Sequence, residues 1–262
     1  MAALQRGADE GKVRARQVLL GALVRLAGLV SLAAMPVASG QPVRWGGEAD
    51  FNGRYVWRGF TYSEGPVFQP AVWLEAKRVT FSVWSNMPLS REPRQGRFDQ
   101  LFWTATTWRQ MRRWRVEGTL QGYVWQGPPG IPTTRTAEVS GRVSYTAGPV
   151  TLFTLHTTDI AAYRGAYFIE SGVGWERQSR RVKWEAHAIV GAWNGRFNRA
   201  YVDVARGAVD FAQLDLAASI PLKGGWYLRP HAELTQITSQ VIRQAVTNRR
   251  VLNAGVALGW TF

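Results

Sequence analysis

The end of the chain, Leu252-Asn253-Ala254-Gly255-Val256-Ala257-Leu258-Gly259-Trp260-Thr261-Phe262, alternates apolar residues with small or polar ones. Successive side chains of a β-strand point to opposite faces, so this pattern predicts a strand with one apolar face and one small or polar face. The stretch also ends on an aromatic residue, Phe262. Such a final strand is typical of transmembrane β-barrels, whereas the alternative is an edge strand of a soluble β-sandwich.

The N-terminal region has the pattern of a secretory signal peptide. Basic residues precede an apolar run from Val18 to Val37, and Ala38-Ser39-Gly40 supplies small residues for cleavage. The alternative is a membrane-anchor helix, but Arg25 interrupts the run and argues against it. We therefore predict a cleaved signal peptide over residues 1–40 and a mature domain over residues 41–262.

The composition narrows the function classes. The chain has 262 residues and no cysteine, which excludes disulfides, thiol catalysis and a lipidated cysteine. Its formal net charge is +14, a balance that often indicates nucleic-acid binding. Here the basic residues are spread between apolar alternating segments of an exported chain. We therefore expect no nucleic-acid partner, and anionic lipopolysaccharide or anionic solutes instead.

One sequence pattern repeats from Val43 to the end of the chain. Segments of alternating hydrophobicity, about ten residues long, are separated by turn signals, as in transmembrane barrels. We predict strands over residues 45–57, 67–76, 79–87, 99–108, 114–125, 136–145, 150–158, 166–176, 182–193, 208–220, 226–235 and 251–262. Many aromatic residues lie near the ends of these strands, where an interfacial girdle belongs. Examples are Trp45, Tyr55, Trp57, Trp114, Trp193 and Trp226.

The predicted connections alternate between short and long. Short turns fall near residues 77, 112, 148, 180 and 223. Outer-membrane barrels have short periplasmic turns and longer outer loops, so both termini are expected in the periplasm. Beyond the N-terminal region no window reaches about 18 consecutive apolar residues, so only a closed barrel could span a membrane. The predicted fold class is all-β, a transmembrane antiparallel up-and-down β-barrel of about 12 strands in the outer membrane of a Gram-negative bacterium.

Strand parity places many charged side chains on the inner face. The residues predicted to line a pore are Arg54, Arg58, Arg115, Glu117, Arg142, Glu170, Lys183, Glu185, His187, Arg229, His231 and Glu233. Inward charges of both signs favour a narrow hydrated pore whose charges select solutes. The alternative is a lumen filled by paired charges, because twelve strands lie between the filled eight-stranded and the open sixteen-stranded barrels.

One stretch resembles a known family. It reads Phe51-Asn52-Gly53-Arg54-Tyr55-Val56-Trp57-Arg58-Gly59-Phe60-Thr61-Tyr62-Ser63-Glu64-Gly65-Pro66-Val67-Phe68-Gln69-Pro70. It is similar to the first hairpin of the TorF-type porins, also called the Gcw_chp family, at Tyr55, Trp57, Arg58, Gly59, Ser63, Pro66 and Gln69. The resemblance implies an outer-membrane barrel with transport activity and no catalytic residues. We expect Arg58 at the outer end of the first strand, paired near Glu64 or bound to a phosphate-bearing lipid.

The three histidines do not predict an enzyme. Hydrolases of this kind of barrel need a nucleophile beside a base, and no histidine here is followed by a serine two residues on. His156, His187 and His231 are all expected to face inward, but they lie on the seventh, ninth and eleventh predicted strands, so no two are neighbours. We therefore expect no catalysis, no metal and no cofactor.

These patterns predict a porin-like channel for passive diffusion of small hydrophilic solutes, anions among them. The alternative is a non-conducting structural or surface-binding barrel that anchors lipopolysaccharide or a partner. The expected partners are outer-membrane lipids and lipopolysaccharide, small solutes, and the barrel-assembly machinery through the C-terminal strand that ends in Phe262.

Overall fold

Strands of the mature domain close into a barrel. The computed structural model describes residues 43–90, 95–126 and 133–262, so the predicted signal peptide (residues 1–40) lies outside the described residues. Twelve strands form the closed sheet, and every neighbouring pair is antiparallel. The predicted fold class, an antiparallel all-β barrel of about twelve strands, is confirmed.

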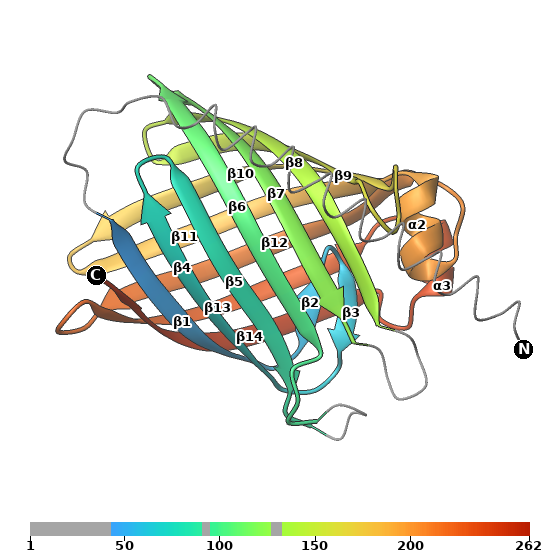
Figure 1. The fold of residues 1–262 in the computed structure, drawn as a ribbon, viewed down its shortest axis with the longest axis horizontal. Helices are drawn as coiled ribbons and strands as arrows, with labels where there is room; N and C mark the ends of the chain where they lie inside the picture. Colours follow the sequence, from blue (N-terminus) through green and yellow to red (C-terminus); the bar gives the residue numbers. More distant parts are fainter. Residues whose placement is uncertain (1–42, 91–94, 127–132) are drawn as a thin grey trace, which may run out of the picture. The chain divides into compact units, whose positions relative to one another are not determined.

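The barrel strands follow one another around the sheet in chain order (Figure 1). They are β1 (Arg44–Asn52), β4 (Val67–Ala76), β5 (Val79–Pro88), β6 (Gln100–Met111), β7 (Trp114–Trp125), β8 (Thr134–Ala147), β9 (Val150–Asp159), β10 (Tyr167–Ser179), β11 (Val182–Trp193), β12 (Ala208–Pro221), β13 (Trp226–Ile237) and β14 (Arg250–Thr261). The last strand, β14, pairs with β1 and closes the barrel, as the C-terminal pattern predicts.

The outer face of the barrel is apolar and the inner face is polar. On β14, Leu252 is 68% exposed and Leu258 is 41% exposed, whereas Asn253 is 7% exposed and Ala257 is fully buried. Outward apolar side chains on other strands repeat the pattern, so the band runs around the barrel. An apolar outside and a polar inside are the two faces that a membrane-spanning barrel requires.

Short and long connections lie at opposite ends of the barrel. Short turns join β4 to β5, β6 to β7, β8 to β9, β10 to β11 and β12 to β13, and the long connections gather at the other end (Figure 1). The Trp45 amide donates to the Phe262 carbonyl (3.0 Å), and the Phe262 amide donates to the Trp45 carbonyl (2.9 Å). The described chain therefore begins and ends at the short-turn end.

A separate hairpin stands between β1 and β4. In it, β2 (Tyr55–Trp57) pairs with β3 (Phe60–Ser63) in a sheet of its own. Arg58 and Gly59 form the two-residue turn with φ angles of +49° and +82°, as a tight hairpin turn requires. The prediction of one strand over residues 45–57 is wrong, because alternation continues through the hairpin while the backbone leaves the barrel sheet.

Two short helices lie in long connections of the described chain, where no sequence pattern predicted them. Helix α2 (Gly195–Val202) is capped by Asn194, whose side chain accepts a hydrogen bond from the Phe197 amide. Helix α3 (Gln240–Ala245) is capped by Ser239. Both caps satisfy amide groups that the first helical turn leaves unpaired. In the described part of the chain, no helix has the length and apolar character needed to cross a membrane.

The hydrophobic core lies at the long-loop end of the barrel. Phe60 of the hairpin packs with Trp193 of β11, Phe211 of β12, Phe197 of α2 and Ile242 of α3. Each of these side chains is at most 7% exposed. The core therefore ties the hairpin and both helices to the ends of the barrel strands.

Candidate functional site

The β2–β3 hairpin fills the lumen at the long-loop end. Trp57 contacts Phe102 of β6, with ring centroids 6.1 Å apart. Phe60 stacks on Trp193 of β11, with ring centroids 4.5 Å apart. Since β6 and β11 are five strands apart in a twelve-stranded ring, the hairpin bridges nearly opposite walls.

A buried ion pair anchors the tip of the hairpin. Arg58 donates from Nη1 to Glu138 Oε1 of β8 (2.7 Å) and from Nη2 to Oε2 (2.5 Å), and the two side chains are 8% and 2% exposed. The guanidinium also lies 4.3 Å from the centre of a Trp57 ring. The expectation that Arg58 ends the first strand and pairs near Glu64 is wrong, because the turn carries Arg58 into the lumen. A buried bidentate pair holds its partners firmly, since either charge alone would be costly to bury.

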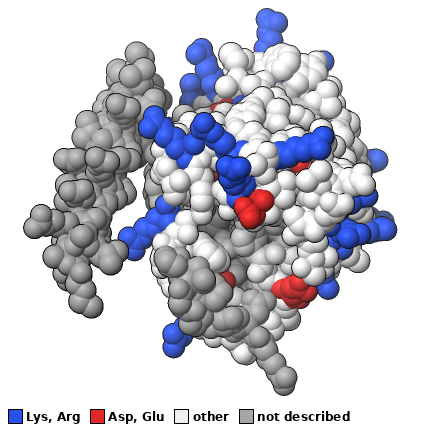
Figure 2. All heavy atoms as spheres, turned by 90° about the vertical axis from the view of Figure 1, so that its right-hand side faces the viewer, with Lys and Arg blue, Asp and Glu red and all other residues white. Residues whose placement is uncertain are grey.

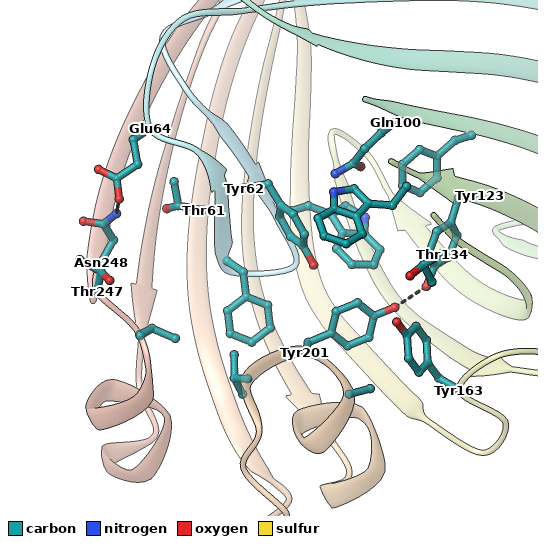
Figure 3. A pocket seen from close by; sticks show the side chains of 17 residues that line it. Thr61, Tyr62, Glu64, Gln100, Tyr123, Thr134, Tyr163, Tyr201, Thr247 and Asn248 are labelled. Carbon is teal, nitrogen blue, oxygen red and sulfur yellow. Dashed lines mark hydrogen bonds between the residues drawn. The ribbon is translucent and has the colours of Figure 1, made fainter. Parts of the chain in front are cut away.

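An aromatic cavity of about 390 Å³ lies between the hairpin, α2 and the segment after α3, and we call it the outer cavity (Figure 3). Its aromatic lining consists of Trp57, Phe60, Tyr62, Phe102, Tyr123, Trp125, Tyr163 and Tyr201. The hydroxyls of Tyr123 and Tyr201 are hydrogen-bonded, and Figure 3 shows the Tyr163 hydroxyl beside them. Burial raises the pKa of Tyr201, so its hydroxyl stays protonated.

A second cavity, the middle cavity, has a volume of about 400 Å³. Trp57 and Phe102 line both the outer and the middle cavity, so their rings stand between the two. The rest of its lining is mostly polar and includes Asp50, Asn52, Arg54, Gln69, His231, Glu233 and Asn253. His231 Nε2 lies 2.9 Å from Asp50 Oδ1. This cavity therefore offers a small, mostly polar space below the hairpin.

The third cavity, the inner cavity, is larger than the other two, with a volume of about 630 Å³, and lies at the short-turn end. Arg177 lines this cavity together with five charged residues that form ion pairs. Glu117 contacts Arg115 at 2.8 Å and Arg142 at 3.7 Å. Lys183 contacts Glu176 of the lining, and Glu185 next to it, at 3.0 Å each. The three bases are 39–41% exposed, whereas Glu117 is 18%, Glu185 is 15% and Glu176 is 54% exposed. Bases therefore provide much of the charged surface that a solute would meet.

Side chains of β13 reach across β14 to β1. Arg229 lies 3.9 Å from Glu48 on β1 and 3.8 Å from Glu185 on β11, and the Tyr227 hydroxyl donates to Glu48 (2.7 Å). A Cβ atom at Gly259 of β14 would overlap the Tyr227 ring. The bare glycine thus lets β13 side chains lie flat across the closing strand and bond to β1.

The remaining predicted lumen residues lie on the inner wall. His187 of β11 is the register partner of Asp215 on β12, and Glu233 accepts a hydrogen bond from Thr235 (2.7 Å). Glu170 lies on β10 on the same face as Glu176. The structure thus brings Arg115, Glu117 and Arg142 together, and joins Lys183, Glu185 and Arg229 in a second chain of ion pairs.

One histidine does not face the lumen. His156 is exposed on the outer face of β9, with Nδ1 2.5 Å from the Tyr167 hydroxyl. The inward prediction for His156 is wrong because the apolar and polar residues of β9 do not alternate clearly. Among the residues that the structure describes, no group of three His, Cys, Asp or Glu side chains could hold a metal ion.

Several functional residues escaped prediction. Tyr55, Trp57 and Trp193, expected in the aromatic girdle, lie instead in the hairpin and the core. Tyr163 and Tyr201 lie in long connections, where periodicity carries no signal. The pairing of Glu138 with Arg58, 80 positions away along the chain, leaves no local sequence pattern.

Basic side chains surround the long-loop end. Figure 2 looks onto this end and shows Lys and Arg around its edge, with few Asp or Glu. The long connections at this end contain Arg164, Arg196, Arg199, Arg206, Arg243 and Arg249. Such a rim attracts anions through long-range electrostatics.

No family model and no curated protein matches the chain, so the resemblance to the TorF-type porins stays a prediction. Solved structures share the fold. A KdgM porin matches with a TM-score of 0.52 and 7% identity over 83% of this chain and 99% of the porin. A NanC porin matches with a TM-score of 0.51 and 8% identity, over 83% of this chain and 98% of the porin. A KdgM porin in complex with disordered oligogalacturonate matches with a TM-score of 0.50 and 7% identity, over 84% of this chain and 99% of the porin.

Proposed function

We propose that this chain is a porin-like channel for passive diffusion of small hydrophilic solutes, anions among them, across the outer membrane of a Gram-negative bacterium. The observation that carries the proposal is a series of three cavities inside a closed barrel whose outer face is apolar. Passive passage needs no chemical step and no cofactor. Residues 1–40 would act as a cleaved signal peptide. Both ends of the barrel would lie in the periplasm, because short turns face the periplasm in outer-membrane barrels.

The charged lining is proposed to guide solutes through the two lower cavities. The proposed pore-lining residues are Arg54, Arg115, Glu117, Arg142, Glu170, Lys183, Glu185, His187, Arg229, His231 and Glu233. Arg58 has a different role in this proposal, because its buried pair with Glu138 holds the hairpin and keeps it away from solute. The half-exposed bases of the inner cavity would favour anions over cations.

Two further features support the proposal. A KdgM porin of the same fold binds oligogalacturonate, an anionic sugar chain that suits a lumen with exposed bases. The stretch from Tyr55 to Gln69 supports the finer assignment to the TorF-type porins. The strand that ends in Phe262 would engage the barrel-assembly machinery, and the apolar outer face would contact outer-membrane lipids.

Single-channel conductance of the folded mature chain in a planar bilayer, with a salt gradient across it, tests the proposal. We expect discrete current steps and a reversal potential that shows anion preference. Cation preference would mean that the inward acids dominate selectivity. A folded barrel that gives no steps would contradict the channel.

A second function, a non-conducting barrel that binds lipopolysaccharide or a partner at its surface, is favoured by one observation. The hairpin and its buried ion pair fill the long-loop end of the lumen. In this alternative, the basic rim would bind lipopolysaccharide phosphates. Absence of conductance together with lipopolysaccharide binding, measured by calorimetry on the folded chain, would support it over the channel.

A further inference from the structure

The outer cavity differs in chemistry from the two cavities below it. Among the described residues that line it, Glu64 is the one charged side chain. The inner cavity, in contrast, contains Arg115, Arg142 and Lys183 in its lining. A solute that has passed the basic rim of the long-loop end therefore meets aromatic rings in the outer cavity, and basic groups again only farther in.

The outer cavity combines flat apolar walls with polar groups at their edges. Trp57 lines the cavity. Figure 3 shows the rings of Tyr62 and Tyr201 in its walls, and amide and hydroxyl groups of Gln100, Thr134, Thr247 and Asn248 around it. Thr61 also lines the cavity, and its Oγ1 is buried without a hydrogen-bond partner among the described residues.

This arrangement fits one chemistry. Aromatic walls bind the flat face of a ring, while hydroxyl and amide groups bind hydroxyls at the edge of that ring. The volume of about 390 Å³ lies within the range of small-molecule sites, roughly 300–1,000 Å³. An anionic group is expected to bind unfavourably in this cavity, because burial of an anion without a basic partner is costly in free energy.

We propose that the outer cavity is a binding site for an uncharged ring compound with hydroxyl groups at its edge, and that it acts as the recognition site of the channel. The proposal rests on the proposed function and names the solute chemistry that the long-loop end selects. A sugar ring and a phenolic ring share this chemistry. Charge then governs passage in the middle and inner cavities.

The hairpin couples binding to passage. Trp57 and Tyr62 belong to β2 and β3, and Trp57 also stands between the outer and middle cavities. A ring compound held against these side chains occupies the space through which ions must pass. Bound ligand therefore interrupts the ionic current through the channel for as long as it stays.

Calorimetric titration of the folded chain in detergent measures binding without requiring conduction. The probes are cellobiose as an uncharged sugar, 4-hydroxybenzyl alcohol as an uncharged phenol, and benzoate as an anionic ring without hydroxyls. We expect binding of at least one uncharged probe and weaker binding of benzoate. Which uncharged probe binds more tightly identifies the source of the ring.

Variants of Tyr62 locate the site. Tyr62→Leu removes the ring and is expected to weaken binding by about tenfold, while Tyr62→Phe keeps the ring and retains more of the affinity. Tyr145→Leu serves as the matched control, because Tyr145 packs on Trp114 (ring centroids 4.9 Å apart) at the short-turn end, on the outer face. Its loss should leave the affinity unchanged.

The outcomes separate this inference from the channel itself. Binding that Tyr62→Leu abolishes supports the site, even in a chain that gives no current steps. In a conducting chain, the same probe should also interrupt the steps. Lack of binding by both uncharged probes, equal or tighter binding of benzoate, or an affinity untouched by Tyr62→Leu would overturn the site while leaving conduction intact.

Discussion

The two ends of the lumen differ in their side chains: one is packed with aromatic residues and the other is open and lined by charged residues. At the long-loop end a hairpin, two helices and aromatic side chains pack into a core, with Arg58 and Glu138 paired inside it. At the short-turn end the lumen widens into a cavity of about 630 Å³ lined by partly exposed charges. The barrel wall is the same at both ends, so the difference comes from what the connections place inside it.

In the proposed channel, the two ends of the lumen would select solutes in different ways. The packed end offers rings and few charges, so it would discriminate by shape and stacking. The open end offers exposed bases whose partners neutralise them only in part, so it would discriminate by charge. The hairpin adds side chains inside the lumen at the long-loop end only.

Loss of the Arg58–Glu138 pair should give the largest effect. Glu138→Gln leaves the Arg58 charge buried without a carboxylate, which should lower the free energy of unfolding by about 3–5 kcal/mol. Urea unfolding in detergent, followed by tryptophan fluorescence, measures the loss. Glu117→Gln at the open end is the matched control and should cost less than about 1 kcal/mol, because its pair is more exposed. Equal losses of unfolding free energy in Glu138→Gln and Glu117→Gln would contradict the distinction between a packed and an open end.

A clash on the closing strand should give the next largest effect. Gly259→Ala places a methyl group where the Tyr227 ring crosses β14, and overpacking of this kind costs roughly 1–3 kcal/mol. Gly141→Ala is the control, because a Cβ there meets nothing within 4 Å. We expect its unfolding free energy to stay within about 0.5 kcal/mol of the natural chain. An unchanged free energy of unfolding in Gly259→Ala would show that the contacts of Tyr227 across β14 do not stabilise the open end.

Removal of inner-cavity bases should change selectivity more than stability. The double variant Arg115→Gln, Arg142→Gln removes two exposed charges, and the anion-to-cation permeability ratio should fall by on the order of twofold to fivefold, as expected for partly screened charges. Reversal potentials in a salt gradient measure the ratio. Arg109→Gln, an exposed base on the outer parity of β6, should leave the ratio unchanged. A similar fall of the permeability ratio in both variants would show that bases on the outer surface of the barrel, and not those of the inner cavity, set the selectivity.

The barrel wall could be predicted from the sequence, but its contents could not. Alternation and turn signals set most strands within a few residues, because burial on one face imposes a period of two on every strand. The same period extends through β1 and β2, so the departure of the hairpin at Gly53 left no trace in the pattern. The pairing of Arg58 with Glu138, 80 positions away, depends on the closed barrel, and so does the meeting of Tyr123 and Tyr201.

The most direct test of the divided lumen compares single-channel conductance of the natural chain with that of a chain lacking the hairpin. Asn52 and Val67 are register partners on β1 and β4, so Asn-Gly in place of residues 53–66 would join them by a two-residue turn. We expect both folded barrels to give discrete steps, and those of the shortened chain to be at least about twofold larger, since the packed end limits the current. Equal steps from the two folded barrels would contradict the division.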